Sequence, residues 1–252
     1  MDATPSWEMM YRDEKYRWFW PPAYDPITNA AEVANVIRLL AAEPDTRLLD
    51  LACGLGWLTI PLAQQGFDVT GFDLSATLLN RAEAAANEAG ASVAWVRGDM
   101  RALPDAWTAS FDYVTLTLSE FGCFPEEADN QQVLTDVARV LKPGGRFLLD
   151  LVVNRDGLVH GNLDHCLDGG SYVVSAQGSF DLITGIHTRE YYWYYDGERH
   201  ETTWQIRAYT PPEVAGMLQR AGLNVNGVFA NLAGAELARN SVGMTFVAQK
   251  PG

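Results

Sequence analysis

The 252-residue sequence is poor in basic side chains, with 18 Lys and Arg against 32 Asp and Glu and a formal net charge of −14 at pH 7. Proteins that hold nucleic acid by its phosphates need clustered Lys and Arg, and no basic run occurs. The composition argues against DNA or RNA as a partner. It favours a neutral, cationic or small-molecule ligand, although the acidity is equally explained as a solubility feature.

Cysteines are also few. Cys53, Cys123 and Cys166 are widely spaced, so they indicate neither a closed disulfide framework nor a Cys-x-x-Cys metal site. His160 and His165 lie near Cys166, but they lack a recurring pair spacing, and we predict no metal. Reduced thiols in a cytoplasmic protein fit this pattern best.

Long apolar runs are missing as well. No run approaches the length of a membrane span, and the first 20 residues are charged and aromatic rather than basic and then apolar. The sequence therefore predicts neither a signal peptide nor a membrane helix. With 48% hydrophobic residues, the chain is long enough for one large domain or for one domain with an elaborate insertion.

The chain does contain a regular alternation of strand-like and helix-like segments, which is typical of βα units around a parallel sheet. The expected strands are 47–51, 68–73, 92–97, 111–117 and 145–152, and the expected helices are 57–65, 75–89 and 126–141. A helix at 211–221 and strands at 223–230 and 243–249 follow. We expect an α/β, Rossmann-like, seven-stranded, mostly parallel sheet with helices on both faces and an antiparallel last strand.

Residues 154–210 break this alternation. They contain three β-rich stretches at 172–174, 186–195 and 202–209, and Asp196-Gly197 is a strong hairpin signal. We predict an antiparallel β-rich cap insertion of two to four strands. The resulting division is an N-terminal aromatic segment (1–25), a core (26–153), the cap (154–210) and the C-terminal part of the core sheet (211–252).

A glycine-containing turn follows the first expected strand, at Asp50-Leu51-Ala52-Cys53-Gly54-Leu55-Gly56. Gly54 and Gly56 permit unusual backbone dihedrals and close approach of a cofactor. Asp50 lies at the carboxyl end of the strand, where open α/β sheets bind ligands. The dinucleotide fingerprint would need a third glycine where Trp57 stands, so a nicotinamide-dependent reductase is disfavoured.

This turn resembles the Asp-x-x-x-Gly-x-Gly motif of class I S-adenosylmethionine-dependent methyltransferases, and the resemblance extends over roughly residues 30–155. Asp73 ends the next expected strand, Gly98-Asp99-Met100 follows the third, and Leu141-Lys142-Pro143-Gly144-Gly145-Arg146-Phe147 is similar to the family's turn into the fifth. Ala52 stands where many members have glycine, and Leu55 where many have a small polar residue. The resemblance implies S-adenosylmethionine as cofactor and methyl transfer to N, O, S or C of a small-molecule acceptor.

The resemblance also implies a set of cofactor-binding residues. Asp73 would bind the ribose hydroxyls, Asp99 with Met100 the adenine, and Asp50 the methionine amino group, with a structural role for Asp50 as the alternative. The full set is Asp50, Ala52, Cys53, Gly54, Gly56, Asp73, Leu74, Asp99, Met100, Thr117 and Leu118.

Candidates for catalysis and acceptor binding are less sharply defined. Ser119 and Glu120 follow the fourth expected strand, where Glu120 could accept a proton or hold an amine, or could be a solvated loop acid. The acceptor-binding candidates are Tyr11, Tyr16, Trp20, Tyr192 and Arg207. The aromatic residues among them could instead pack on a sheet or form a homodimer contact. An alternative function is S-adenosylmethionine binding without methyl transfer, as in a cyclase-like or regulatory protein.

Overall fold

The computed structural model describes residues 26–117, 121–158, 165–168, 173–195 and 198–252. The core strands are β1 (Arg47–Leu51), β2 (Asp68–Asp73), β3 (Ala94–Arg97), β4 (Phe111–Leu116), β5 (Leu141–Leu151), β10 (Asn224–Phe229) and β11 (Met244–Gln249). The helices are α3 (Pro26–Leu40), α4 (Thr59–Gln64), α5 (Ala76–Glu88), α6 (Glu127–Val140), α7 (Arg155–Leu158) and α8 (Pro211–Arg220), with a 3-10 turn, η2 (Asp105–Trp107).

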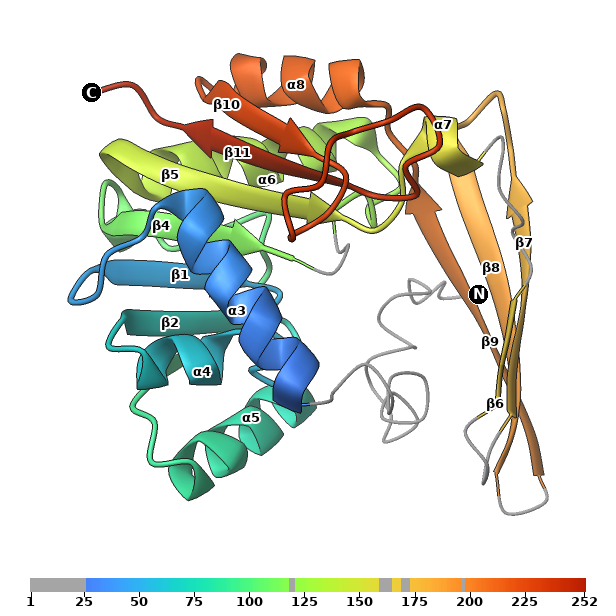
Figure 1. Cartoon of the computed structure of the whole chain (residues 1–252), viewed down its shortest axis with the longest axis horizontal. Helices are drawn as coiled ribbons and strands as arrows, with labels where there is room; N and C mark the ends of the chain where they lie inside the picture. The colour runs from blue at the N-terminus through green and yellow to red at the C-terminus, as the bar shows by residue number, and fades with distance from the viewer. Residues whose placement is uncertain (1–25, 118–120, 159–164, 169–172, 196–197) are drawn as a thin grey trace.

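The seven core strands form one sheet in the order β10-β11-β5-β4-β1-β2-β3 (Figure 1). Strand β1 pairs in parallel with β2 and β4, and β3 and β5 extend the parallel part on either side. Strand β11 is antiparallel to both β5 and β10. This arrangement confirms the predicted fold class, and it brings the carboxyl ends of β1, β2, β4 and β5 to one edge of the sheet.

Both faces of the sheet are covered, which explains why its central strands are nearly continuous apolar runs. On one face, Val36 of α3 and Leu62 of α4 pack with Leu48 of β1. On the other face, Val137 of α6 and Leu218 of α8 belong to a larger buried cluster. Successive residues of a strand point to opposite faces, so each central strand can contribute to both clusters.

Helix ends follow their local sequence signals. Oγ of Ser75 accepts a hydrogen bond from N of Leu78 at 3.3 Å, as expected for an N-cap. Thr210 and Glu213 form a capping box at the start of α8. The expected helix at 57–65 begins at Thr59 instead, because the glycine turn continues through Gly56.

The cap is a four-stranded antiparallel sheet of β6 (His165–Asp168), β7 (Val173–Phe180), β8 (Ile186–Tyr195) and β9 (Glu198–Arg207). Trp204 and Ile206 of β9 pack in one buried cluster with Val153 and Leu158. The apolar face of the cap sheet is therefore anchored just beyond the end of β5, beside α7 (Figure 1).

Candidate functional site

The turn after β1 has a left-handed backbone at three positions, with φ of +53° at Ala52, +53° at Gly54 and +76° at Gly56. Such values favour glycine because they bring a Cβ close to the backbone. A Cβ on Gly56 would also lie 2.7 Å from Cη2 of Trp95, whereas a Cβ on Gly54 would meet only Leu78, at 3.9 Å. The turn is therefore packed tightly beneath Gly56 and open at Gly54.

Asp73 joins the end of β2 to this turn. Its Oδ2 accepts a hydrogen bond from N of Gly54, and its Oδ1 accepts one from N of Ser75, both at 2.8 Å. Burial raises the pKa of Asp73, although these backbone donors oppose the shift. A carboxylate has about four acceptor positions, so Asp73 can also accept hydrogen bonds from ligand hydroxyls.

Asp50 is buried beneath the turn, with 1% of its surface exposed. It accepts hydrogen bonds from Oγ1 of Thr59 at 2.6 Å and from Oγ1 of Thr115 at 2.9 Å. Desolvation raises its pKa to about 6, despite the two hydroxyl donors. These contacts connect β1 with α4 and β4, and they favour the structural alternative for Asp50 over direct contact with a ligand.

Asp99 follows β3 and is held by Arg101. Nη2 of Arg101 donates to Oδ2 of Asp99 at 2.6 Å, and Nε lies 3.1 Å from both carboxylate oxygens. These hydrogen bonds lower the pKa of Asp99. Nη1 of Arg101 also donates to Asp129 of α6, at 2.8 Å. Sequence reasoning missed Arg101, because its contact with Asp129 spans 28 residues and follows no motif spacing.

The other predicted cofactor residues surround the same edge of the sheet. Ala52 and Met100 pack against one buried cluster, and Cys53 is buried, which raises the pKa of its thiol. The carbonyl of Leu74 accepts a hydrogen bond from Nε of Arg97, and Thr117 directly follows β4.

Six predicted site residues lie outside the described part of the chain, within 1–25 and 118–120. One is a predicted cofactor contact, two are predicted catalytic residues and three are predicted acceptor contacts. They are, in that order, Leu118, Ser119, Glu120, Tyr11, Tyr16 and Trp20.

Tyr192 lies on the face of the cap sheet opposite to the one anchored on the core. Tyr192 pairs with Glu201, so the two side chains share a face of the sheet. Trp204 lies three residues further along β9 and therefore points to the opposite face, which is the buried one. The hydroxyl of Tyr192 donates a hydrogen bond to Oε2 of Glu190 at 2.8 Å, on the same face as Tyr192. Tyr192 therefore points away from the face that packs on the core.

Arg207 connects the cap to the loop that follows β4. Its Nη1 donates to the carbonyl of Thr184 at 2.7 Å, and its Nη2 donates to the carbonyl of Pro125 at 3.2 Å. Its backbone N donates to the carbonyl of Gly122 at 2.9 Å, where a Cβ on Gly122 would lie 2.5 Å from the Arg207 carbonyl oxygen. These contacts indicate that Arg207 fixes the base of the cap.

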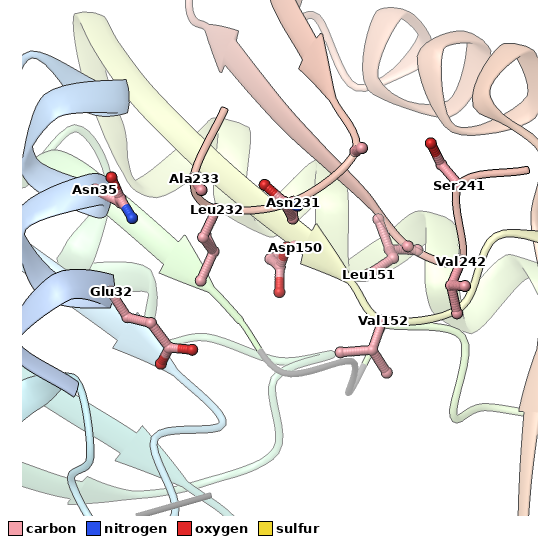
Figure 2. Close-up of a pocket in the computed structure, with 12 residues that line it drawn as sticks. Glu32, Asn35, Asp150, Leu151, Val152, Asn231, Leu232, Ala233, Ser241 and Val242 are labelled. Carbon is pink, nitrogen blue, oxygen red and sulfur yellow. The ribbon is translucent and has the colours of Figure 1, made fainter. Parts of the chain in front are cut away.

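A pocket of about 600 Å³ lies between α3, the end of β5 and two segments from the C-terminal part of the chain (Figure 2). Its described lining residues are Glu32, Asn35, Asp150, Leu151, Val152, Ala230, Asn231, Leu232, Ala233, Ser241, Val242 and Gly243. Asp150 is buried and accepts a hydrogen bond from Oγ1 of Thr245 at 2.6 Å. Sequence reasoning missed this pocket, because its walls come from four separate segments.

The pocket is joined to the glycine turn through one side-chain contact. Nε1 of Trp57 donates a hydrogen bond to Oε2 of Glu32 at 3.2 Å, and Trp57 directly follows Gly56. Asp150, at the other side of the pocket, lies one residue beyond Leu149, which pairs with Leu116 at the end of β4. The pocket therefore adjoins the edge of the sheet where the predicted cofactor residues gather.

Two other kinds of site find no support in the part of the chain that is described. No three or more His, Cys, Asp or Glu side chains gather there in a way that could hold a metal ion. None of its helices has both the length and the apolar character that crossing a membrane requires.

Comparison with known proteins gives a consistent result. Residues 48–145 match the family model described as a methyltransferase domain. The putative methyltransferase YqeM of Bacillus subtilis (strain 168) is 28% identical over 210 residues, which cover 81% of this chain and 84% of that protein. The segment of this chain that matches the family model contains the glycine turn, Asp73, Asp99 and Arg101.

Solved structures resemble the whole fold, cap included. An S-adenosylmethionine-dependent methyltransferase from Clostridium acetobutylicum ATCC 824 has a TM-score of 0.80 at 21% identity and covers 94% of this chain and 98% of its own. CalS10, an amino pentose methyltransferase from Micromonospora echinaspora with S-adenosylmethionine bound, has a TM-score of 0.70 at 20% identity, with coverage of 94% and 97%.

Proposed function

We propose that this chain, which belongs to the class I S-adenosylmethionine-dependent methyltransferases, transfers a methyl group to N, O, S or C of a small-molecule acceptor. The observation that carries the proposal is the pocket of about 600 Å³ beside the glycine turn. This volume is within the usual range for small-molecule sites. The net charge of −14 and the absence of a basic run in the sequence agree with an acceptor other than nucleic acid.

The residues at the turn fit the cofactor. Gly54 leaves the backbone open to a ligand, and Asp73 offers carboxylate oxygens beside it. We assign Asp73 to the ribose hydroxyls, and Ala52, Cys53, Gly54, Gly56 and Leu74 to the walls of the cofactor site. Asp99 and Met100 are assigned to the adenine side, with Arg101 fixing the orientation of the Asp99 carboxylate.

S-adenosylmethionine supplies an activated methyl group when it is bound. The chain's own task is then positioning, because holding two reactants about 3–3.5 Å apart in line can itself lower a barrier by several kcal/mol. Asp50 contributes indirectly, since its bonds to Thr59 and Thr115 fix the turn against α4 and β4. Thr117 with Leu118 is assigned to the region near the methyl group, and Ser119 and Glu120 to the acceptor.

The assignments of Tyr11, Tyr16 and Trp20 to acceptor binding stay predictions, as do the cytoplasmic location, the homodimer and the division into four segments. For the cap, the contacts of Tyr192 and Arg207 support a structural role more than contact with the acceptor. We propose that Arg207 acts by holding the cap in position over the loop after β4.

The test is product analysis with the purified chain. Ligand-free protein is incubated with S-adenosylmethionine and pools of small amines, alcohols, thiols and phenols, and S-adenosylhomocysteine is quantified together with methylated products by mass spectrometry. We expect equal amounts of both products with at least one pool, and less of both products with Asp73→Ala when the cofactor is limiting. Cofactor binding without methyl transfer to any pool would instead support the cyclase-like or regulatory alternative.

A further inference from the structure

The pocket beside the glycine turn has an acidic lining. Glu32 of α3 and Asp150 of β5 supply two carboxylates, and no Lys, Arg or His occurs among its described lining residues. Figure 2 shows both carboxylates at the same hollow. Asp150 retains only 7% of its surface exposed. Two carboxylates among the lining residues give the pocket a negative electrostatic potential, which favours a positively charged ligand.

The same pocket exposes apolar side chains. Four large hydrophobic residues are exposed in the described part of the chain, and two of them, Val152 (38%) and Val242 (63%), line this pocket. Exposed apolar surface around a concave site is typical of binding to an organic molecule. A volume of about 600 Å³ is also far larger than a metal ion needs.

Arg38 is the nearest basic residue along α3, and its guanidinium group bonds to the wall of the pocket. Its Nη2 donates hydrogen bonds to the carbonyl of Ala233 at 3.0 Å and to Oδ1 of Asn35 at 3.1 Å. Arg38 thereby holds the segment around Ala233 against α3, which shapes one wall of the pocket. The amide groups of Asn35 and Asn231 leave hydrogen-bonding groups along that wall.

We propose that the acceptor is a small organic molecule that carries an amine protonated at neutral pH, and that Glu32 and Asp150 hold this ammonium as a binding group. The apolar or ring portion of the acceptor lies against Val152 and Val242. This inference rests on the proposed function and names the substrate class of the same site. The hydrogen bond from Trp57 to Glu32 places the amine beside the cofactor turn, and the net charge of −14 favours the approach of a cation.

The experiment is a ligand-observed NMR screen of the full chain saturated with S-adenosylhomocysteine. The probe is a fragment library of matched triplets, in which each skeleton carries an ammonium, a hydroxyl or a carboxylate group. The screen is repeated with Glu32→Gln and Asp150→Asn, which keep the side-chain shape and an oxygen that can accept from Trp57 or Thr245. The matched control is Glu83→Gln, which removes the same charge from an exposed position on α5.

We expect ammonium fragments to dominate the hits in the wild type, and each pocket variant to weaken their binding about tenfold or more. The affinity of the neutral fragments should change less than about twofold in the pocket variants. Glu83→Gln should leave the affinities of both the ammonium and the neutral fragments unchanged. Equal binding of the three classes, a preference for carboxylates, no fragment binding, or unchanged ammonium binding in both pocket variants would overturn the inference. Failure of the wild type to bind S-adenosylhomocysteine would count against the proposed function instead. Retained S-adenosylhomocysteine binding shows that each variant is folded.

Discussion

The glycine turn and the acidic pocket adjoin each other, yet they are built in opposite ways. The turn is one continuous segment after β1, and two of its hydrogen bonds, between Gly54 and Asp73 and between Asp50 and Thr59, span 19 and 9 residues. The pocket is assembled from α3, β5 and two segments of the C-terminal part, and the contact from Arg38 to Ala233 that shapes it spans 195 residues. The cofactor side therefore depends on local backbone geometry, whereas the acceptor side depends on how distant segments pack.

This difference has a functional consequence. A cofactor shared by many enzymes can be held by a short motif that tolerates few changes. An acceptor site made from long-range contacts can change its shape and charge without altering that motif. Substitutions should accordingly separate the two regions, with some affecting cofactor binding and others only the acceptor.

The largest combined effect on stability and cofactor binding is expected for Gly56→Ala. The new Cβ would require a left-handed backbone, at φ +76°, and would lie 2.7 Å from Trp95. We expect the free energy of unfolding to fall by about 2 kcal/mol or more. We also expect most of the cofactor binding to be lost.

Gly90→Ala is the matched control for this packing effect, because Gly90 has φ +65° but nothing within 4 Å of an added Cβ. Its cost should be about 1 kcal/mol, with cofactor affinity unchanged. Denaturant unfolding and calorimetry measure both quantities. Equal costs at the two glycines would contradict tight packing beneath Gly56.

Asp50→Asn tests the buried carboxyl beneath the turn. Its pKa is raised to about 6, so the folded state binds a proton more tightly than the unfolded chain, in which the pKa has its ordinary value of 3.8. Asp50 therefore contributes most to stability when it is protonated, and this contribution falls as pH rises from about 4 to 6. Relative to Asp50→Asn, the wild type should lose about 3 kcal/mol in total, most of it within this window, and nothing further above about pH 7.

The measurement is urea unfolding of both proteins across that pH range, and the difference between the two curves isolates Asp50. Lost hydrogen bonds to Thr59 or Thr115 would shift the variant by a constant amount and leave the slope unaffected. Asp105→Asn serves as the control, because Asp105 is exposed on η2. A difference curve that is flat or rises with pH would contradict a dominant effect of desolvation on Asp50.

Asp73→Ala should weaken cofactor binding without changing the acidic pocket. Removing this carboxylate leaves the N–H of Gly54 and the ribose hydroxyls without their acceptor. We expect the affinity for S-adenosylhomocysteine to fall by about tenfold or more, as measured by equilibrium dialysis. Fragment binding in the acidic pocket should persist. Unchanged cofactor affinity would reject the assignment of Asp73 to the ribose.

The smallest effect on stability is expected for Arg207→Ala, which acts on the acceptor side. The carbonyls of Thr184 and Pro125 would lose a charged donor at the base of the cap, at a cost of about 1 kcal/mol. Acceptor KM should rise while cofactor affinity stays the same, as steady-state kinetics and calorimetry would show. Arg199→Ala, at an exposed position on β9, is the control. A weakened cofactor affinity in Arg207→Ala would contradict the separation of the two regions.

The sequence predicted the fold well because its signals are local. The βα alternation, the Ser75 N-cap and the strand-end acids all lie within a few residues of the structures that they specify. The four-stranded cap was within the predicted range of two to four strands. Helix α4 begins two residues later than predicted, since periodicity alone cannot show where a left-handed turn ends.

The candidate site was only partly accessible to such reasoning. The acids at 50, 73 and 99 were found, but their partners Thr59, Thr115 and Arg101 were not. Glu32 and Asp150 were missed because an acid on a helix and an acid in a strand carry no shared spacing. Tyr192 was selected from an aromatic run, although alternation along β8 leaves its direction undetermined until the pairing with β9 is known.

The most direct test of this separation between cofactor and acceptor sides is a calorimetric titration of S-adenosylmethionine into ligand-free wild type and Glu32→Gln. We predict one-site binding with similar affinity in both proteins, since the cofactor is held at the turn and the acceptor in the pocket. Two results would contradict this separation: no S-adenosylmethionine binding to folded wild type, or binding that is lost in Glu32→Gln.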